Sequence, residues 1–131
     1  MSAKPIKGIA HDTLTFILEV SKSTAPNEFA GLLRAENGII TEVLVLPGTT
    51  SSEVSAVMHL FMLPMISIAG SVHSHPTPNA RPSMHDLAMF VRTGNCHIIV
   101  GFPYNEDSWR CYDVNGERRE LSVVDIDFEQ V

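Results

Sequence analysis

The sequence predicts an α/β (α+β) fold in which one mixed β-sheet is flanked by helices. Short strand-like runs recur along the chain, two helical periodicities are inserted among them, and Asn-Gly turns join two pairs of runs. The length of 131 residues suits one domain, so we expect a single domain over 1–131. The order of elements lacks a doubly wound βαβαβ rhythm, and neither common glycine-rich phosphate-binding motif is present.

The first half of the chain predicts a helix followed by a hairpin. Residues 12–22 place Leu14, Ile17 and Leu18 at helical spacing, and Asp12 is the expected N-cap. The strand-like runs 28–36 and 39–46 are then joined by Asn37-Gly38, a pair in which both residues tolerate positive φ.

Residues 53–69 are apolar without a clean period, and Pro64 excludes one continuous helix through them. A strand over 53–60 is favoured, while a turn or a short helix stays open. The run contains several methionines and other large apolar residues, which we interpret as core unless exposed, in which case they would contact a partner: Met58, Leu60, Phe61, Met62 and Met65.

The second half predicts a strand, a loop and a helix, followed by three further strands. The strand covers 70–75, and the helix covers 84–93, where Leu87, Phe90 and Val91 lie at helical spacing. The later strands are expected over 96–102, 108–114 and 118–126, the last two joined through Asn115-Gly116.

Composition excludes some classes of function. A net charge of −6 argues against a surface that collects phosphates, so nucleic acid is not an expected partner. The sequence contains no apolar run near the roughly 20 residues that span a bilayer and no signal peptide, so we expect a cytoplasmic protein that does not enter membranes. Cys96 and Cys111 predict buried free thiols, with a single disulfide as the alternative.

The stretch VHSHPTPNARPSMHD, residues 72–86, carries the chemistry. On a strand, residues i and i+2 face the same way, so His73 and His75 can converge on one metal ion. Two imidazoles and a carboxylate form a catalytic zinc site with one position left for water, and Asp86 in the first turn of the following helix can supply the carboxylate. Ser83 and Asp86 also fit a helix capping box, which is the structural alternative. The remaining histidines are interpreted as structural or solvent-facing: His11, His59, His85 and His97.

These residues resemble the signature of the JAMM (MPN+) zinc metalloprotease family, which reads His-x-His, seven residues, then Ser-x-x-Asp. The match has no gap, and the likeness extends over most of the chain, especially to short stand-alone archaeal members. The resemblance implies a cytidine-deaminase-like MPN fold and one catalytic Zn²⁺ held by His73, His75 and Asp86. It also implies that Glu28, in the setting Glu28-Phe29-Ala30-Gly31, is the general base, and that Ser83 stabilises the oxyanion.

The activity implied by the resemblance is hydrolysis of the bond after the C-terminal Gly-Gly of a ubiquitin-like modifier, commonly an isopeptide bond. Substrates would be ubiquitin-like proteins or their conjugates, so the protein would be a deubiquitinase-like isopeptidase. Three alternatives stay open: a processing peptidase for a sulfur-carrier precursor, a catalytically inert MPN scaffold, and an Fe(II) oxygenase that uses the same ligands. The oligomeric state is left open, with a homodimer among the options.

Overall fold

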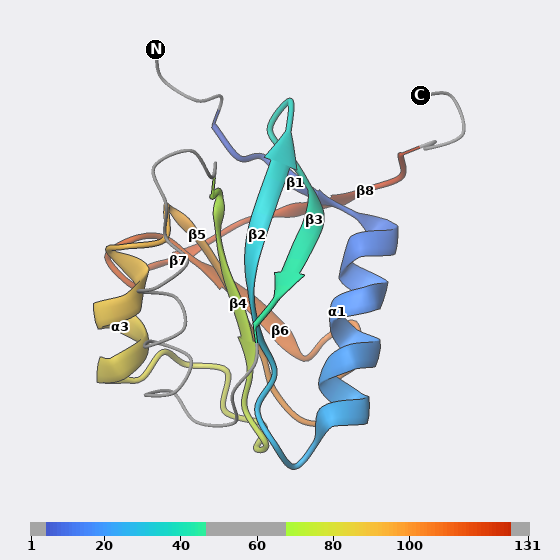
Figure 1. Ribbon diagram of the computed structural model, residues 1–131, viewed down its shortest axis with the longest axis vertical. Helices are drawn as coiled ribbons and strands as arrows, with labels where there is room; N and C mark the ends of the chain where they lie inside the picture. The colour runs from blue at the N-terminus through green and yellow to red at the C-terminus, as the bar shows by residue number, and fades with distance from the viewer. Residues whose placement is uncertain (1–4, 47–67, 127–131) are drawn as a thin grey trace.

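The computed structural model describes residues 5–46 and 68–126, and its main feature is a mixed sheet with a helix on each face (Figure 1). The elements in chain order are β1 (Gly8–Ala10), α1 (His11–Thr24), β2 (Ala30–Glu36), β3 (Ile39–Val45), β4 (Gly70–Ser74), α3 (Met84–Phe90), β5 (Cys96–Val100), β6 (Trp109–Tyr112), β7 (Arg118–Arg119) and β8 (Ser122–Val124). The described strands form one 8-stranded sheet in the order β7-β6-β5-β4-β2-β3-β1-β8. The predicted fold class is confirmed.

The sheet curls until its two edges are close together. Strands β7 and β8 are separated by only Glu120 and Leu121, yet β7 pairs with β6 at one edge and β8 pairs with β1 at the other. The red ribbon in Figure 1 follows this path across the molecule. The single strand predicted over 118–126 is therefore wrong, because the chain has to change partners at the buried Leu121.

The main core lies between α1 and one face of the sheet. Helix α1 contributes Leu14, Ile17 and Leu18, which pack against buried strand residues. Val72 from β4 and Ile98 from β5 belong to this core, and both are almost completely inaccessible. Because side chains alternate along a strand, the neighbouring residues of β4 and β5 face away from α1.

Helix α3 covers the opposite face. Phe90 packs with Ile99 and Tyr112, while Met89 packs with Ala30 and Leu32. This second layer is thin because α3 spans only 7 residues. It is nevertheless the face that receives the histidines of β4.

The helix boundaries differ from those predicted. Helix α1 begins one residue before Asp12 and uses Ala10 as its N-cap, with no side-chain hydrogen bond, so the Asp12 prediction is wrong. Ala10 is already fixed by its pairing with Val124, and Asp12 lies in the first turn, where a negative charge suits the helix dipole. Helix α3 ends at Phe90 instead of reaching residue 93, and the apolar Leu87 within it and Val91 at its C-cap are exposed.

The two Asn-Gly turns have different geometries. Asn37 and Gly38 have φ of 53° and 81°, which confirms the predicted tight hairpin between β2 and β3. At the second turn Gly116 alone has positive φ, and its N–H donates to the carbonyl of Asp113 at 3.0 Å. That connection is a longer turn closed by a left-handed glycine, so only part of the expected geometry is present.

Cys96 and Cys111 are buried free thiols, as predicted, with their sulfurs 3.4 Å apart. Neither described helix combines the length and apolar character needed to cross a membrane. The strand over 53–60, the choice around Pro64, His59 and the methionine-rich run lie outside the described residues.

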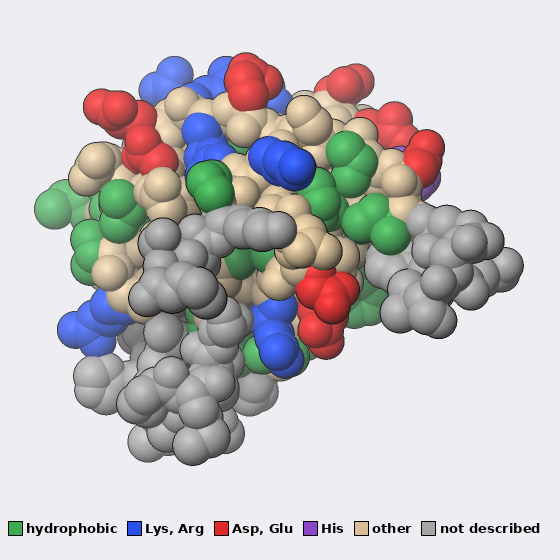
Figure 2. All heavy atoms as spheres, turned by 90° about the horizontal axis from the view of Figure 1, so that it is seen from above, with side chains coloured by type: hydrophobic (Ala, Val, Ile, Leu, Met, Phe, Trp, Pro, Cys, Tyr) green, Lys and Arg blue, Asp and Glu red, His purple; other side chains and the backbone are tan. Residues whose placement is uncertain are grey.

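Figure 2 shows the molecule from above, over the end where the β2–β3 hairpin turns. Acidic and basic side chains are interspersed on this face instead of gathering by sign.

Candidate metal centre

The histidine pair lies at the carboxyl end of β4, which is hydrogen-bonded to β2 on one side and β5 on the other. Ser71, His73 and His75 alternate with Val72, and therefore face α3. The strand ends before His75, whose N–H still donates to the carbonyl of Val100 at 2.7 Å. One imidazole is thus held within a central strand, and the other directly follows that strand.

The carboxylate comes from the first turn of α3. Ser83 Oγ accepts a hydrogen bond from the Asp86 N–H at 3.1 Å, and Asp86 Oδ2 accepts one from the Ser83 N–H at 2.8 Å. The capping box therefore exists, and it coexists with the cluster of His73, His75 and Asp86. By holding one carboxylate oxygen, the cap fixes the direction in which Asp86 presents its charge.

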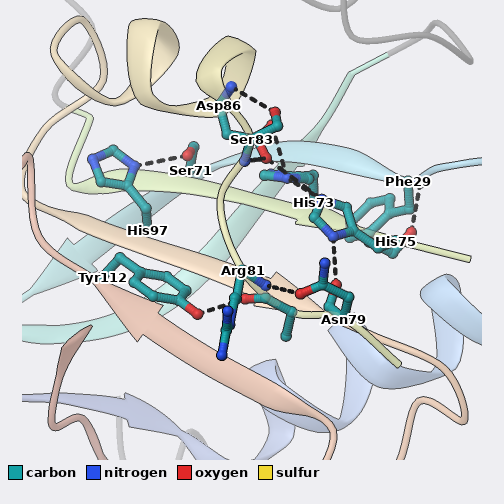
Figure 3. Close-up of polar contacts among 12 residues, drawn as sticks. Phe29, Ser71, His73, His75, Asn79, Arg81, Ser83, Asp86, His97 and Tyr112 are labelled. Atoms are coloured by element: carbon teal, nitrogen blue, oxygen red, sulfur yellow. Dashed lines mark hydrogen bonds and ion pairs between the residues drawn. The ribbon is translucent and has the colours of Figure 1, made fainter. Parts of the chain in front are cut away.

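The three side chains converge, as Figure 3 shows. His73 Nε2 lies 3.1 Å from His75 Nε2 and 3.1 Å from Asp86 Oδ1, and His75 Nε2 lies 3.5 Å from Asp86 Oδ2. One potential ligand atom from each residue lies within 4.8 Å of the others. The side chains of His73 and Asp86 are only 5% and 2% exposed, so the converging charge is shielded from water.

The chemistry of the donor set fits a divalent cation. The Nδ1 atom of His75 donates to the carbonyl of Asn79 at 2.7 Å, since that oxygen can only accept. This leaves the Nε2 lone pair of neutral His75 directed at His73 and Asp86. A shared cation stabilises lone pairs that face one another. The separations near 3 Å between the nitrogen and oxygen atoms also suit ligands that bind one zinc ion at about 2.0–2.2 Å.

Protons compete with a cation for the same lone pairs. The hydrogen bond to Asp86 raises the pKa of His75, although burial opposes the shift. Burial raises the pKa of Asp86, but hydrogen bonds from His73 and His75 outweigh it and bring the pKa well below its usual value. Asp86 therefore stays ionised, and cation binding should release protons and weaken in acid.

Glu28 lies beside this cluster. It precedes β2, in which Ala30 pairs with His73. Phe29 and Ser74 continue this pairing: the Ser74 N–H donates to the Phe29 carbonyl, and the Phe29 N–H donates to Ser74 Oγ, both at 2.8 Å. Continuing the register places Glu28 opposite His75 and on the α3 side, because Phe29 faces the α1 core. Its negative charge also contributes to the raised pKa of His75.

Comparison with known proteins identifies the family. A family model described as prokaryotic homologs of the JAB domain matches residues 11–112. A probable metalloprotease from Haloferax volcanii is 42% identical over 136 residues, covering 95% of this chain and 84% of that protein.

This chain belongs to the prokaryotic JAB family of JAMM/MPN domains. A JAB1/MPN domain protein from Archaeoglobus fulgidus superimposes with a TM-score of 0.75 and 40% identity, covering 90% of this chain and 99% of the other. A structure described as a JAMM metalloprotease-like zinc site in the proteasome and signalosome gives 0.75 and 39%, covering 92% and 99%. With its complete His-His-Asp group, the chain is a JAMM-type metalloprotease with one Zn²⁺ as cofactor.

The buried pair of Ser71 and His97, next to the metal ligands, was not predicted from the sequence. Ser71 Oγ lies 2.7 Å from His97 Nδ1, and His97 Nε2 lies 2.8 Å from the carbonyl of Gly94. The His97 ring stacks on Phe90 with centroids 4.0 Å apart. His97 is structural, as expected, and it joins β4, β5 and the end of α3 below the metal ligands.

His11 is exposed near Asp12, and His85 is exposed on α3.

The His97 ring gives the protein a predictable pH dependence. Burial lowers the pKa of His97 to about 4 in the folded state. Its value in an unfolded chain is about 6.5, so below that pH the unfolded state binds the extra proton. The contribution of His97 to the free energy of unfolding is therefore complete above about pH 6.5. It is lost as the pH falls toward 4, and the loss is at most about 3 kcal/mol.

We therefore expect the free energy of unfolding of the metal-free protein to fall more steeply between pH 6.5 and 4 than that of His97→Gln. Urea unfolding in a chelating buffer measures both curves, and the other histidines cancel in the difference. Parallel curves would show that His97 is not held in its neutral form.

Proposed function

We propose that this metalloprotease is an isopeptidase that hydrolyses the bond after the C-terminal Gly-Gly of a ubiquitin-like modifier. The observation that carries the proposal is the position of Glu28, on the same side of the sheet as the converging His73, His75 and Asp86. A carboxylate next to a metal cluster, but outside it, is the arrangement that general-base hydrolysis needs. The match to the JAMM signature supports the choice of bond.

His73, His75 and Asp86 would hold the zinc. When bound, zinc would supply Lewis acidity, which lowers the pKa of water so that hydroxide is available near neutral pH and which polarises the scissile carbonyl. The protein groups do the rest. Asn79 keeps His75 in the tautomer that presents Nε2, and the capping hydrogen bond from Ser83 keeps Asp86 oriented.

Glu28 would move the protons. Its carboxylate accepts a proton from the attacking water and then donates it to the departing lysine amine, so that the amine leaves as a neutral group. One residue can perform both transfers because the carboxylate is restored at the end of the reaction. Glu28 is partly buried, which leaves a face open to water and substrate.

Ser83 would stabilise the oxyanion. Its oxygen accepts from the Asp86 N–H, so its own O–H remains available to donate to the developing negative charge. Its exposure in the structure is consistent with contact to a substrate. We expect Ser83→Ala to lower kcat by about 10²- to 10³-fold, the usual cost of losing one oxyanion donor.

The same substitution removes the helix cap, which costs about 1 kcal/mol of stability. Ser83→Asp keeps a capping acceptor but lacks a hydroxyl donor, so it separates the two roles. Single-turnover rates of the zinc-loaded proteins measure the effect. Recovery of activity in Ser83→Asp would assign the loss to capping alone.

The proposed substrate class can be tested with matched conjugates. A ubiquitin-like protein joined through Gly-Gly to a lysine side chain should be cleaved faster than the same protein with a linear C-terminal extension. A conjugate whose two glycines are replaced by alanines is the control. Preference for the linear extension would favour the processing peptidase, and no cleavage by zinc-loaded enzyme would favour the inert scaffold.

A further inference from the structure

The segment between the metal ligands has a defined path although it contains no helix or strand. Residues 76–83 connect His75 to the capping box of Asp86. Two consecutive carbonyls in this segment accept side-chain hydrogen bonds: Asn79 O from His75 Nδ1 at 2.7 Å, and Ala80 O from the Tyr112 hydroxyl at 2.6 Å. The first bond orients a metal ligand, and the second lies one residue further along the backbone.

Tyr112 reaches this segment from a distant part of the chain. It lies on β6, which is separated from β4 by β5, and it is 32 positions from Ala80 in the sequence. Only 5% of Tyr112 is exposed, and its ring packs with Phe90 and Ile99 beneath α3. Burial raises the pKa of the Tyr112 phenol, which favours the protonated form that donates the bond.

We propose that Tyr112 is a positioning residue for His75, an inference that rests on the proposed zinc-dependent function. The hydroxyl fixes the Ala80 carbonyl and so restricts rotation of the preceding Asn79–Ala80 peptide, whose oxygen holds the imidazole of His75. The order of contacts in Figure 3 runs from Tyr112 through the loop to His75. Tyr112 therefore affects the direction of the His75 Nε2 lone pair without touching the metal.

A purely structural role makes a different prediction. If Tyr112 only fills the space below α3, the aromatic ring is sufficient and the hydroxyl has no effect on zinc. Tyr112→Phe keeps that ring against Phe90 and Ile99 and removes only the bond to Ala80. Loss of a group that directly orients a ligand costs about 10- to 100-fold in metal affinity. Tyr112 acts through one more contact, so we expect Tyr112→Phe to weaken zinc binding by roughly 3- to 10-fold.

The matched control is Tyr104→Phe. Tyr104 is also 5% exposed, but it belongs to the core on the α1 side. Zinc dissociation constants of the full-length wild type and both variants are measured by competition with a chromogenic chelator. Thermal unfolding of the metal-free proteins verifies that each is folded, and visible spectra of the Co²⁺-substituted proteins report on ligand geometry.

The expected result is weaker zinc binding and an altered Co²⁺ spectrum for Tyr112→Phe alone. Unchanged affinity in Tyr112→Phe, or equal weakening in both tyrosine variants, would overturn the positioning role while leaving the zinc site intact. Failure of the wild type to bind zinc would instead overturn the proposed function, and with it this inference. The two failures are therefore distinguishable.

Discussion

Replacement of Glu28 by glutamine is expected to lower kcat/KM for a Gly-Gly-Lys isopeptide by about 10²- to 10⁴-fold while zinc stays bound. Glutamine has nearly the same size as glutamate but cannot accept the proton of the attacking water. The metal ligands are untouched, because Glu28 is outside the group formed by His73, His75 and Asp86. The loss should therefore appear in the chemical step rather than in zinc content.

The control for Glu28→Gln is Glu36→Gln, which makes the same change at the exposed far end of β2. Single-turnover kinetics and elemental analysis are performed on the same preparations. Full activity in metal-loaded Glu28→Gln would remove Glu28 from the mechanism. Loss of zinc from that variant would mean that the carboxylate binds the metal instead of transferring protons.

Replacement of His73 by alanine is expected to remove the zinc and to lower activity by roughly 10³-fold or more, since Lewis acidity contributes several kcal/mol. His73 Nε2 lies 3.1 Å from His75 Nε2 and 3.1 Å from Asp86 Oδ1, so its loss removes the ligand atom that is close to both of the others. Zinc present at about 1,000 times its dissociation constant stabilises the wild type by about 4 kcal/mol. The variant should lose this response.

Thermal unfolding with and without added zinc measures that stabilisation. His11→Ala is the matched control, because His11 is exposed at the start of α1 and away from the cluster. A zinc-dependent rise in the melting temperature of His73→Ala equal to that of wild type would show that the metal binds elsewhere.

Much of the metal site could be predicted from local patterns. The alternation of a strand places His73 and His75 on one face, and the spacing to Ser83 predicts a helix start that brings Asp86 close. Both patterns act over a few residues. The sequence presented capping and metal binding as alternatives, whereas the structure shows that the cap orients Asp86 within the cluster.

Other parts of the site depend on contacts between segments far apart in the sequence. Glu28 could be selected only through the family resemblance, because its place beside His75 follows from the antiparallel register of β2 and β4. The Ser71–His97 pair depends on the parallel register of β4 and β5. The Tyr112 contact also requires β6 to lie two strands from β4, which no local pattern specifies.

The fold shows the same division. The Asn37-Gly38 hairpin was predictable because two residues determine its turn. The N-terminus of α1 was misassigned because the pairing of β1, rather than a capping side chain, sets the direction of the backbone there. The break between β7 and β8 arises from the curl of the whole sheet, which alternation within 118–126 does not encode.

X-ray absorption at the zinc K edge tests the central claim most directly. For purified wild type containing one zinc per chain, we predict two imidazole nitrogens and oxygen ligands at about 2.0–2.2 Å, with one imidazole lost from any zinc that remains in His73→Ala. Sulfur ligands at about 2.3 Å, or a spectrum unchanged by His73→Ala, would contradict the assignment of zinc to His73, His75 and Asp86.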